Sequence, residues 1–174
     1  WCANPPLLAG ILGAAAVLAW VRHHDFTARE KEKAELARVD RVFRGLVRDT
    51  AAIPRPTNLL SVVASVAGES VDQMITNRRG IARLVLTEPG LALGPLGLGG
   101  LPYNQTMAGS VAPRNPRLLL LSSAGSPLPT NLVSGAALDA LQFSNLWNAA
   151  QGRAPADWAW DGNAEDLCIQ RVHT

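Results

Sequence analysis

Oxygen-bearing side chains alternate near the end of the chain. The run Asp161-Gly162-Asn163-Ala164-Glu165-Asp166 places acidic and amide groups at every second position, as the opening of a calcium loop does. The bidentate glutamate that closes such a loop is missing, so a solvated acidic turn is the alternative. The pattern makes Asp161, Asn163 and Glu165 candidate calcium ligands, and apart from calcium we expect no cofactor.

Motifs of the common enzyme classes are absent from the sequence. There is no Gly-x-Ser-x-Gly elbow, no His-Glu-x-x-His zinc motif and no Gly-x-x-x-x-Gly-Lys-Ser/Thr phosphate loop. The histidines stand at positions 23, 24 and 173, and the cysteines at positions 2 and 168, so neither set has the spacing of a catalytic or metal-binding cluster. We therefore expect a protein that is not an enzyme.

A stretch rich in glycine and leucine runs from Pro89 to Pro102. Its five glycines lack the Lys-Ser/Thr ending that a phosphate loop needs, so we expect a long apolar surface loop instead. Large exposed apolar patches usually mark interaction sites. The loop is thus a candidate contact with another subunit, through the leucines Leu91, Leu93, Leu96 and Leu98.

Charged residues are distributed unevenly along the chain. The 174 residues include 16 Lys and Arg against 14 Asp and Glu, for a net charge of +2, and 48% are hydrophobic. Residues 1–21 carry no charge, whereas Arg22 to Asp49 carries eight basic and six acidic side chains. The positive excess is confined to one segment, which excludes the broad basic face of a nucleic-acid-binding protein, and the apolar content excludes a disordered chain.

One long helix is predicted over residues 1–53. It is apolar to Val21, and the uncharged stretch would be about 31 Å long, close to the thickness of the hydrocarbon core of a bilayer. A buried core helix or the apolar part of a secretory signal are the alternatives. The helix then becomes amphipathic and should end near Ile53, before Pro54 and Pro56. Its predicted apolar stripe comprises Phe26, Leu36, Val39, Val42, Phe43, Leu46 and Val47.

Residues 54–174 are predicted to form a compact α+β head that packs on the amphipathic half of this helix. Apolar steps of three and four predict helices at 57–67 and 132–147. Short apolar runs bounded by turn residues predict strands at 81–87, 118–122 and 167–172, enough for a small antiparallel sheet. The fold class is therefore α+β, with a long helical handle and a small head.

The run Asp25-Phe26-Thr27-Ala28-Arg29, directly after an uncharged segment rich in Ala, Leu, Val and Gly, resembles the corresponding stretch of type IV pilins and pilin-like pseudopilins. The resemblance covers about the first 50 residues. It implies a leader removed just before the apolar segment, a ladle-shaped fold, a pool in the inner membrane and delivery by a pilus or secretion machinery. Identical subunits would then form a filament at the cell surface or outside the cell, or in the periplasm for a pseudopilus.

In such a filament the apolar half of the helix would pack against identical neighbours. Small residues allow helices to approach closely, and the charges of the second half would pair across subunits. The alternatives are a minor pseudopilin, or a membrane-anchored periplasmic binding or assembly protein that does not polymerise. The candidate packing residues are Leu7, Leu8, Gly10, Ile11, Leu12, Gly13, Ala14, Val17 and Leu18.

Overall fold

The computed structural model combines one long helix with short helices and two small sheets. It describes residues 5–50, 52–89, 98–100, 117–135, 138–155, 158 and 160–173, with side chains in all of these except 5–12 and 98–100. The elements, in chain order, are α1 (Pro5–Thr50), β1 (Ala52–Pro54), α2 (Pro56–Ala67), α3 (Val71–Ile75), β2 (Leu84–Thr87), β3 (Leu98–Gly100), β4 (Arg117–Ser123), α4 (Ala140–Asn148), a 3-10 turn (Ala164–Asp166) and β5 (Leu167–His173).

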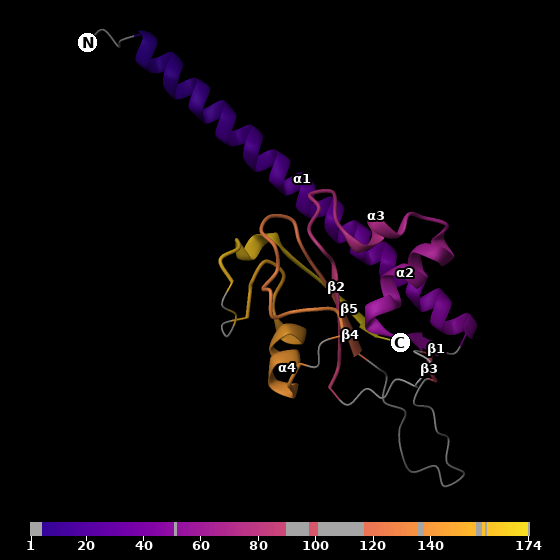
Figure 1. The fold of residues 1–174 in the computed structure, drawn as a ribbon. Helices are drawn as coiled ribbons and strands as arrows, with labels where there is room; N and C mark the ends of the chain where they lie inside the picture. Colours follow the sequence, from indigo (N-terminus) through magenta and orange to yellow (C-terminus); the bar gives the residue numbers. More distant parts are fainter. Residues whose placement is uncertain are drawn as a thin grey trace.

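The long N-terminal helix predicted from the sequence is confirmed as α1. Its first half projects away from the remaining elements, and its second half lies along the head beside α2 and α3 (Figure 1). The helix ends at Thr50 rather than near Ile53. Residues 52–54 instead pair as β1 with β3, which suits a segment whose prolines disfavour helical geometry in the residues before them.

The larger sheet is three-stranded and antiparallel, with the order β2-β4-β5. Its central strand, β4, contains the uninterrupted run Leu118–Leu121, all of it buried. Successive side chains of a strand point to opposite faces, so a strand that is apolar at every position must be covered on both sides. The prediction of a small antiparallel sheet is confirmed.

Two apolar layers provide that cover. Leu118 and Leu120 face α1 and α2, whereas Leu119 and Leu121 face α4 and the connecting loops. The helix side of the core comprises Leu36, Val39, Phe43, Val47, Ile53, Leu59, Leu60, Val63, Ala64, Met74, Val85, Leu118, Leu120, Cys168 and Val172. The other side comprises Leu86, Leu119, Leu121, Leu128, Leu132, Leu138, Phe143, Leu146, Leu167 and Ile169.

The helix predicted over residues 57–67 is confirmed, but the one predicted over 132–147 is too long. Helix α4 begins only at Ala140, because Asp139 and Gln142 form a reciprocal capping box that fixes its start. Before it the chain turns at Gly135, whose φ of 82° suits glycine. Leu132 and Leu138 are buried, as their spacing suggested, but they reach the core from a non-helical segment.

The apolar stripe of α1 is confirmed over its second half only. Leu36, Val39, Phe43 and Val47 are buried against the head. Phe26, which belongs to the same predicted stripe, is 60% exposed, and at this level the head contacts α1 through the ion pairs of Asp25 and Arg29 instead. The head therefore covers less of the helix than the sequence pattern suggested.

Candidate functional site: an apolar arm and the charged groove at its base

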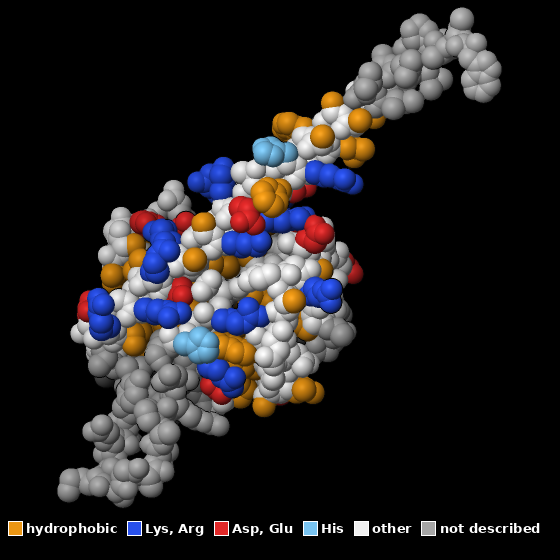
Figure 2. Space-filling view, turned by 180° about the vertical axis from the view of Figure 1, so that it is seen from behind, with side chains coloured by type: hydrophobic (Ala, Val, Ile, Leu, Met, Phe, Trp, Pro, Cys, Tyr) orange, Lys and Arg blue, Asp and Glu red, His pale blue; other side chains and the backbone are white. Residues whose placement is uncertain are grey.

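Residues 13–21 of α1, here called the arm, stand clear of the other described residues (Figure 2). All are apolar, so the helix surface is apolar on every side, and the larger side chains Val17, Leu18 and Trp20 are 60–66% exposed. A helix that is hydrophobic all round is normally buried in a large core or a membrane. Burial of the arm against other apolar groups would therefore be favourable on several of its sides.

The candidate packing residues within the described side chains all lie on this arm. Gly13, Ala14, Val17 and Leu18 are exposed. A methyl group added at Gly13 would have no atom within 4 Å, so nothing within the described structure requires glycine there. The backbone of the remaining candidates lies in α1, but their side chains are outside the described ones: Leu7, Leu8, Gly10, Ile11 and Leu12.

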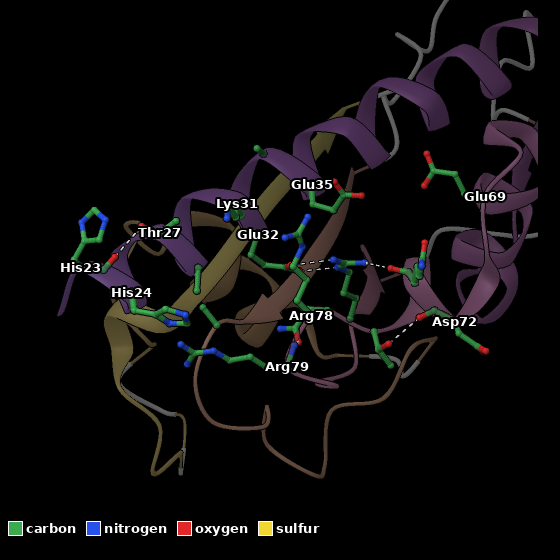
Figure 3. Close-up of a pocket in the computed structure, with 17 residues that line it drawn as sticks. His23, His24, Thr27, Lys31, Glu32, Glu35, Glu69, Asp72, Arg78 and Arg79 are labelled. Carbon is green, nitrogen blue, oxygen red and sulfur yellow. Dashed lines mark hydrogen bonds and ion pairs between the residues drawn. The ribbon is translucent and has the colours of Figure 1, made fainter. Parts of the chain in front are cut away.

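A groove of about 1080 Å³ opens at the base of the arm, between α1 and the segment that runs from α3 to β2. His24 and Arg79 lie at one end, and Glu69 and Asp72 lie at the other (Figure 3). The lining also includes His23, Thr27, Ala28, Lys31, Glu32, Ala34, Glu35, Gln73, Thr76, Asn77, Arg78, Arg83 and Ala124. Most residues of the lining thus have polar or charged side chains, and the end toward the arm has the basic side chains of His24 and Arg79.

A tight turn presents Arg78 and Arg79 to this groove. The buried Asn77 holds the turn, because its Oδ1 accepts hydrogen bonds from the backbone N–H groups of Arg79 and Ile81, at 2.9 and 3.0 Å. Its Nδ2 donates to the carbonyl of Ser123 on β4, at 2.7 Å. Gly80, with φ of 74°, completes the turn. The backbone that bears the two arginines is therefore tied to β4.

Arginines neutralise most of the acids in and around the groove. Arg79 donates to Asp25 at 2.7 Å, and this hydrogen bond holds the pKa of the Asp25 carboxyl below its usual value. Arg38 pairs with both Glu35 and Glu69. Hydrogen bonding to Arg38 lowers the pKa of Glu35, and hydrogen bonding to the two carboxylates raises the pKa of Arg38.

The floor of the groove contains a buried ion pair. The Nε and Nη2 atoms of Arg83 donate to the two carboxylate oxygens of Glu32, at 2.6 and 2.9 Å. The Nη1 atom of the same guanidinium donates to the carbonyls of Gln73 and Met74 in α3, at 2.7 and 3.0 Å. Arg83 therefore joins α1 and α3 at one point.

Some basic side chains in and near the groove have no acidic partner among the described residues. Among the described residues, Arg22, Lys31 and Arg78 form no ion pair, and all three are exposed. Asp72, in the first turn of α3, is the acid of the lining that likewise has no ion pair within the described part of the chain. The junction of arm and head thus has more unpaired positive than negative charge, an arrangement able to bind anions.

Several charges of α1 that we expected to pair across subunits pair within the chain. Arg29 contacts Glu165 and Asp166 before β5, each at 2.6 Å, and Glu32 and Arg38 contact the α2–β2 region. The head lies against this half of α1 and its complementary charges are already within reach, so the intramolecular pairs form.

The candidate calcium ligands lie beside the same contact. Glu165 pairs with Arg29, and the Oδ1 of Asn163 accepts a hydrogen bond from the Glu165 N–H at 3.1 Å. No group of three or more His, Cys, Asp or Glu side chains within the described residues has a metal-binding arrangement. Calcium binding by Asp161, Asn163 and Glu165 stays a prediction, with the added condition that calcium competes with Arg29 for Glu165.

Most of the leucine-rich loop lies outside the described residues. Leu91, Leu93 and Leu96 belong to that part, and Leu98 is described only through its backbone, which pairs with Pro54. Cys168 is a buried, free thiol in β5, and Cys2 is outside the described residues. The proposed subunit contact in this loop therefore stays a prediction.

Sequence reasoning did not identify the residues of the groove that come from the head. Arg78 and Arg79 lie within a turn signal, Asn77 to Gly80, that could have been recognised, and Arg83 follows it. Their position opposite His24 and Asp25 depends on how the head docks against α1, and no local pattern reports it.

Comparison with protein-family models, curated proteins and solved structures finds no match to this chain. A search of the described residues for helices long and apolar enough to cross a membrane finds none.

Proposed function

We propose that this chain is the structural subunit of a type IV pilus-like filament, in which the apolar starts of many identical copies pack together. Before assembly the subunit is held at the inner membrane, and a pilus or secretion machinery delivers it. The filament lies at the cell surface or outside the cell, or in the periplasm for a pseudopilus. The pilin-like run from Asp25 to Arg29 motivates the proposal.

The exposed arm is the observation that carries it. A one-sided apolar stripe needs one partner groove, whereas the arm is apolar all round and needs neighbours on every side. Burying each of the larger side chains contributes about 1.5–3 kcal/mol, so Val17, Leu18, Trp20 and Val21 together favour association strongly. A contact that repeats by rotation and translation without closing produces a filament rather than a ring.

The anchoring of α1 supports the same proposal. The second half of the helix packs on the sheet through Leu36, Val39 and Phe43, and the ion pairs of Arg29, Glu32 and Arg38 reinforce it. A helix that is fixed at one end and apolar at the other matches the handle and bowl of a pilin-like ladle. Once the arm is packed in a filament, the rigid helix would fix the position of the head on the filament surface.

Electron microscopy of the purified full chain after removal of detergent tests the proposal. We expect uniform fibres from the full chain and none from a chain that begins at Asp25, which retains every described head contact named above. The single substitution Gly13→Leu should also prevent assembly, because it adds bulk where copies approach closely. Circular dichroism checks that this variant is folded.

Gly45→Ala controls for the gain in helix propensity that accompanies Gly13→Leu. Gly45 also lies inside α1, also has no atom within 4 Å of an added methyl, and gains helix propensity in the same way. Its variant should assemble normally. Monomeric full chain would instead favour an anchored protein that does not polymerise, and fibres from the Gly13→Leu variant would refute the packing proposed for the arm.

A further inference from the structure

Positive side chains surround the base of the arm, at the point where the apolar surface ends. Arg22, His23 and His24 follow the arm directly in α1 and are exposed. Arg78 belongs to the same turn as Arg79, which contacts Asp25, and its side chain lies further along the groove, near enough to Glu35 for their charges to interact (Figure 3). Lys31 lines the groove one step further along the helix. We call Arg22, His23, His24, Lys31 and Arg78 the collar; Figure 2 shows basic side chains on both sides of the helix here.

We propose that the collar binds the phosphate groups of anionic lipids and thereby holds the unassembled subunit at the membrane surface. The inference rests on the proposed function, because it assigns how a subunit is retained before its arm enters a filament. The ligand is the headgroup layer of a lipid surface, with the basic end of the groove facing the phosphates.

The charge balance favours an anionic ligand. The nearby carboxylates of Asp25, Glu32 and Glu35 are each held by an arginine, so they do not oppose the approach of a phosphate. Asp72, which has no ion pair among the described residues, lies at the far end of the groove from His24 (Figure 3). The positive charges of Arg22 and Lys31 are consequently available to a ligand at the arm end, and Arg78, which has no ion pair among the described residues, adds positive charge further along the groove.

Continuity with the arm favours a lipid over a soluble polyanion. Apolar side chains such as Leu18 and Trp20 would contact acyl chains while the collar lies at headgroup level, so one surface uses both features. A nucleic acid would use the cations and leave the apolar side chains in water. Each basic residue near an anionic membrane surface strengthens binding roughly fivefold, an effect limited to about the Debye length.

Vesicle flotation of the full chain tests the proposal. The probes are vesicles of phosphatidylcholine alone and of phosphatidylcholine mixed with phosphatidylglycerol. The collar variant carries Arg22→Gln, Lys31→Gln and Arg78→Gln, and the control carries Arg41→Gln, Arg48→Gln and Arg153→Gln. Both variants lose three positive charges from exposed positions, but Arg41 lies about 28 Å further along α1 than Arg22.

We expect the full chain and the control to prefer the anionic vesicles, and this preference to weaken with salt. The collar variant should lose roughly fivefold of the preference for each charge removed and still bind the neutral vesicles through its arm. Equal binding of the full chain to both vesicles would overturn the proposal, as would an equal loss in the control. Collar-dependent binding to soluble polyphosphate, with no preference between the vesicles, would assign the site to a soluble polyanion instead.

Fibre formation in lipid-free buffer separates this inference from the proposed function. A collar variant that loses the lipid preference and still forms fibres supports both. If the unsubstituted full chain prefers anionic vesicles but forms no fibres, the filament proposal alone is contradicted. If the unsubstituted full chain forms fibres but has no preference for anionic vesicles, the collar proposal alone is contradicted.

Discussion

Arg83, just before β2, holds Glu32 of α1 through two parallel hydrogen bonds, and the two side chains are only 3% and 6% exposed. The pair joins the long helix to the head independently of the apolar core. Two further bonds to α3 carbonyls satisfy the guanidinium, so the buried charges have the partners that make such burial tolerable. The orientation of the arm relative to the head thus depends on a polar contact.

Removing one partner of this pair should be costly. Glu32→Ala leaves the Arg83 guanidinium buried without its carboxylate, and we expect the free energy of unfolding to fall by about 3–5 kcal/mol. Glu30→Ala is the control, because Glu30 forms an exposed pair with Lys33 worth less than about 1 kcal/mol. Urea denaturation measures both, and similar small losses in the two variants would contradict the assigned role of Glu32.

The contact of Arg29 with Asp166 requires glycine at position 125. A methyl group at Gly125 would lie 2.7 Å from the Asp166 Cγ and closer still to a carboxylate oxygen. Gly125→Ala should therefore displace Asp166, weaken its 2.6 Å bond with Arg29 and lower stability by about 1–3 kcal/mol. Thermal melting measures this loss of stability. In a chain that already carries Arg29→Ala, Gly125→Ala should lower stability by less, because the Arg29–Asp166 bond is already absent.

Burial raises the pKa of the Cys168 thiol from 9.0 to about 11, and the neighbouring Glu32 adds to the effect. Between these values the unfolded chain releases a proton that the folded chain keeps, so stability is unaffected below pH 9 and falls as the pH rises through this window. The slope approaches about 1.4 kcal/mol per pH unit. Denaturation of the wild type and of Cys168→Ala across this range should give curves that diverge above pH 9; parallel curves would argue against a buried neutral thiol.

Trp20 should report assembly. It is 66% exposed in the isolated chain, so its fluorescence should shift to shorter wavelength when neighbouring copies cover the arm. The difference spectrum between wild type and Trp20→Phe isolates its contribution from the other four tryptophans. We expect the shift only under conditions that produce fibres. An unchanged difference spectrum in fibres would show that Trp20 stays in water and is not part of the packed core.

The elements of the fold were largely predictable because local patterns specify them. The change from an uncharged to an amphipathic segment at Arg22 predicted both halves of α1, and the leucine run of β4 predicted a strand, though not its central place in the sheet. The start of α4 was missed, since the capping box at Asp139 interrupts a run whose apolar spacing continues through Leu132 and Leu138.

The candidate site likewise has one part that the sequence predicts and one part that depends on the tertiary structure. The composition of the first 21 residues determined by itself that the chain has an apolar helical segment in need of cover, because hydrophobic burial depends on side-chain type and helical period alone. Only the tertiary structure decided which charges remain available. Arg38 and Arg83 form ion pairs with acidic side chains distant in sequence. Arg22, Lys31 and Arg78 form no ion pair among the described residues. Ion pairing depends on distances of a few ångströms between segments, and those distances exist only once the head has docked on α1.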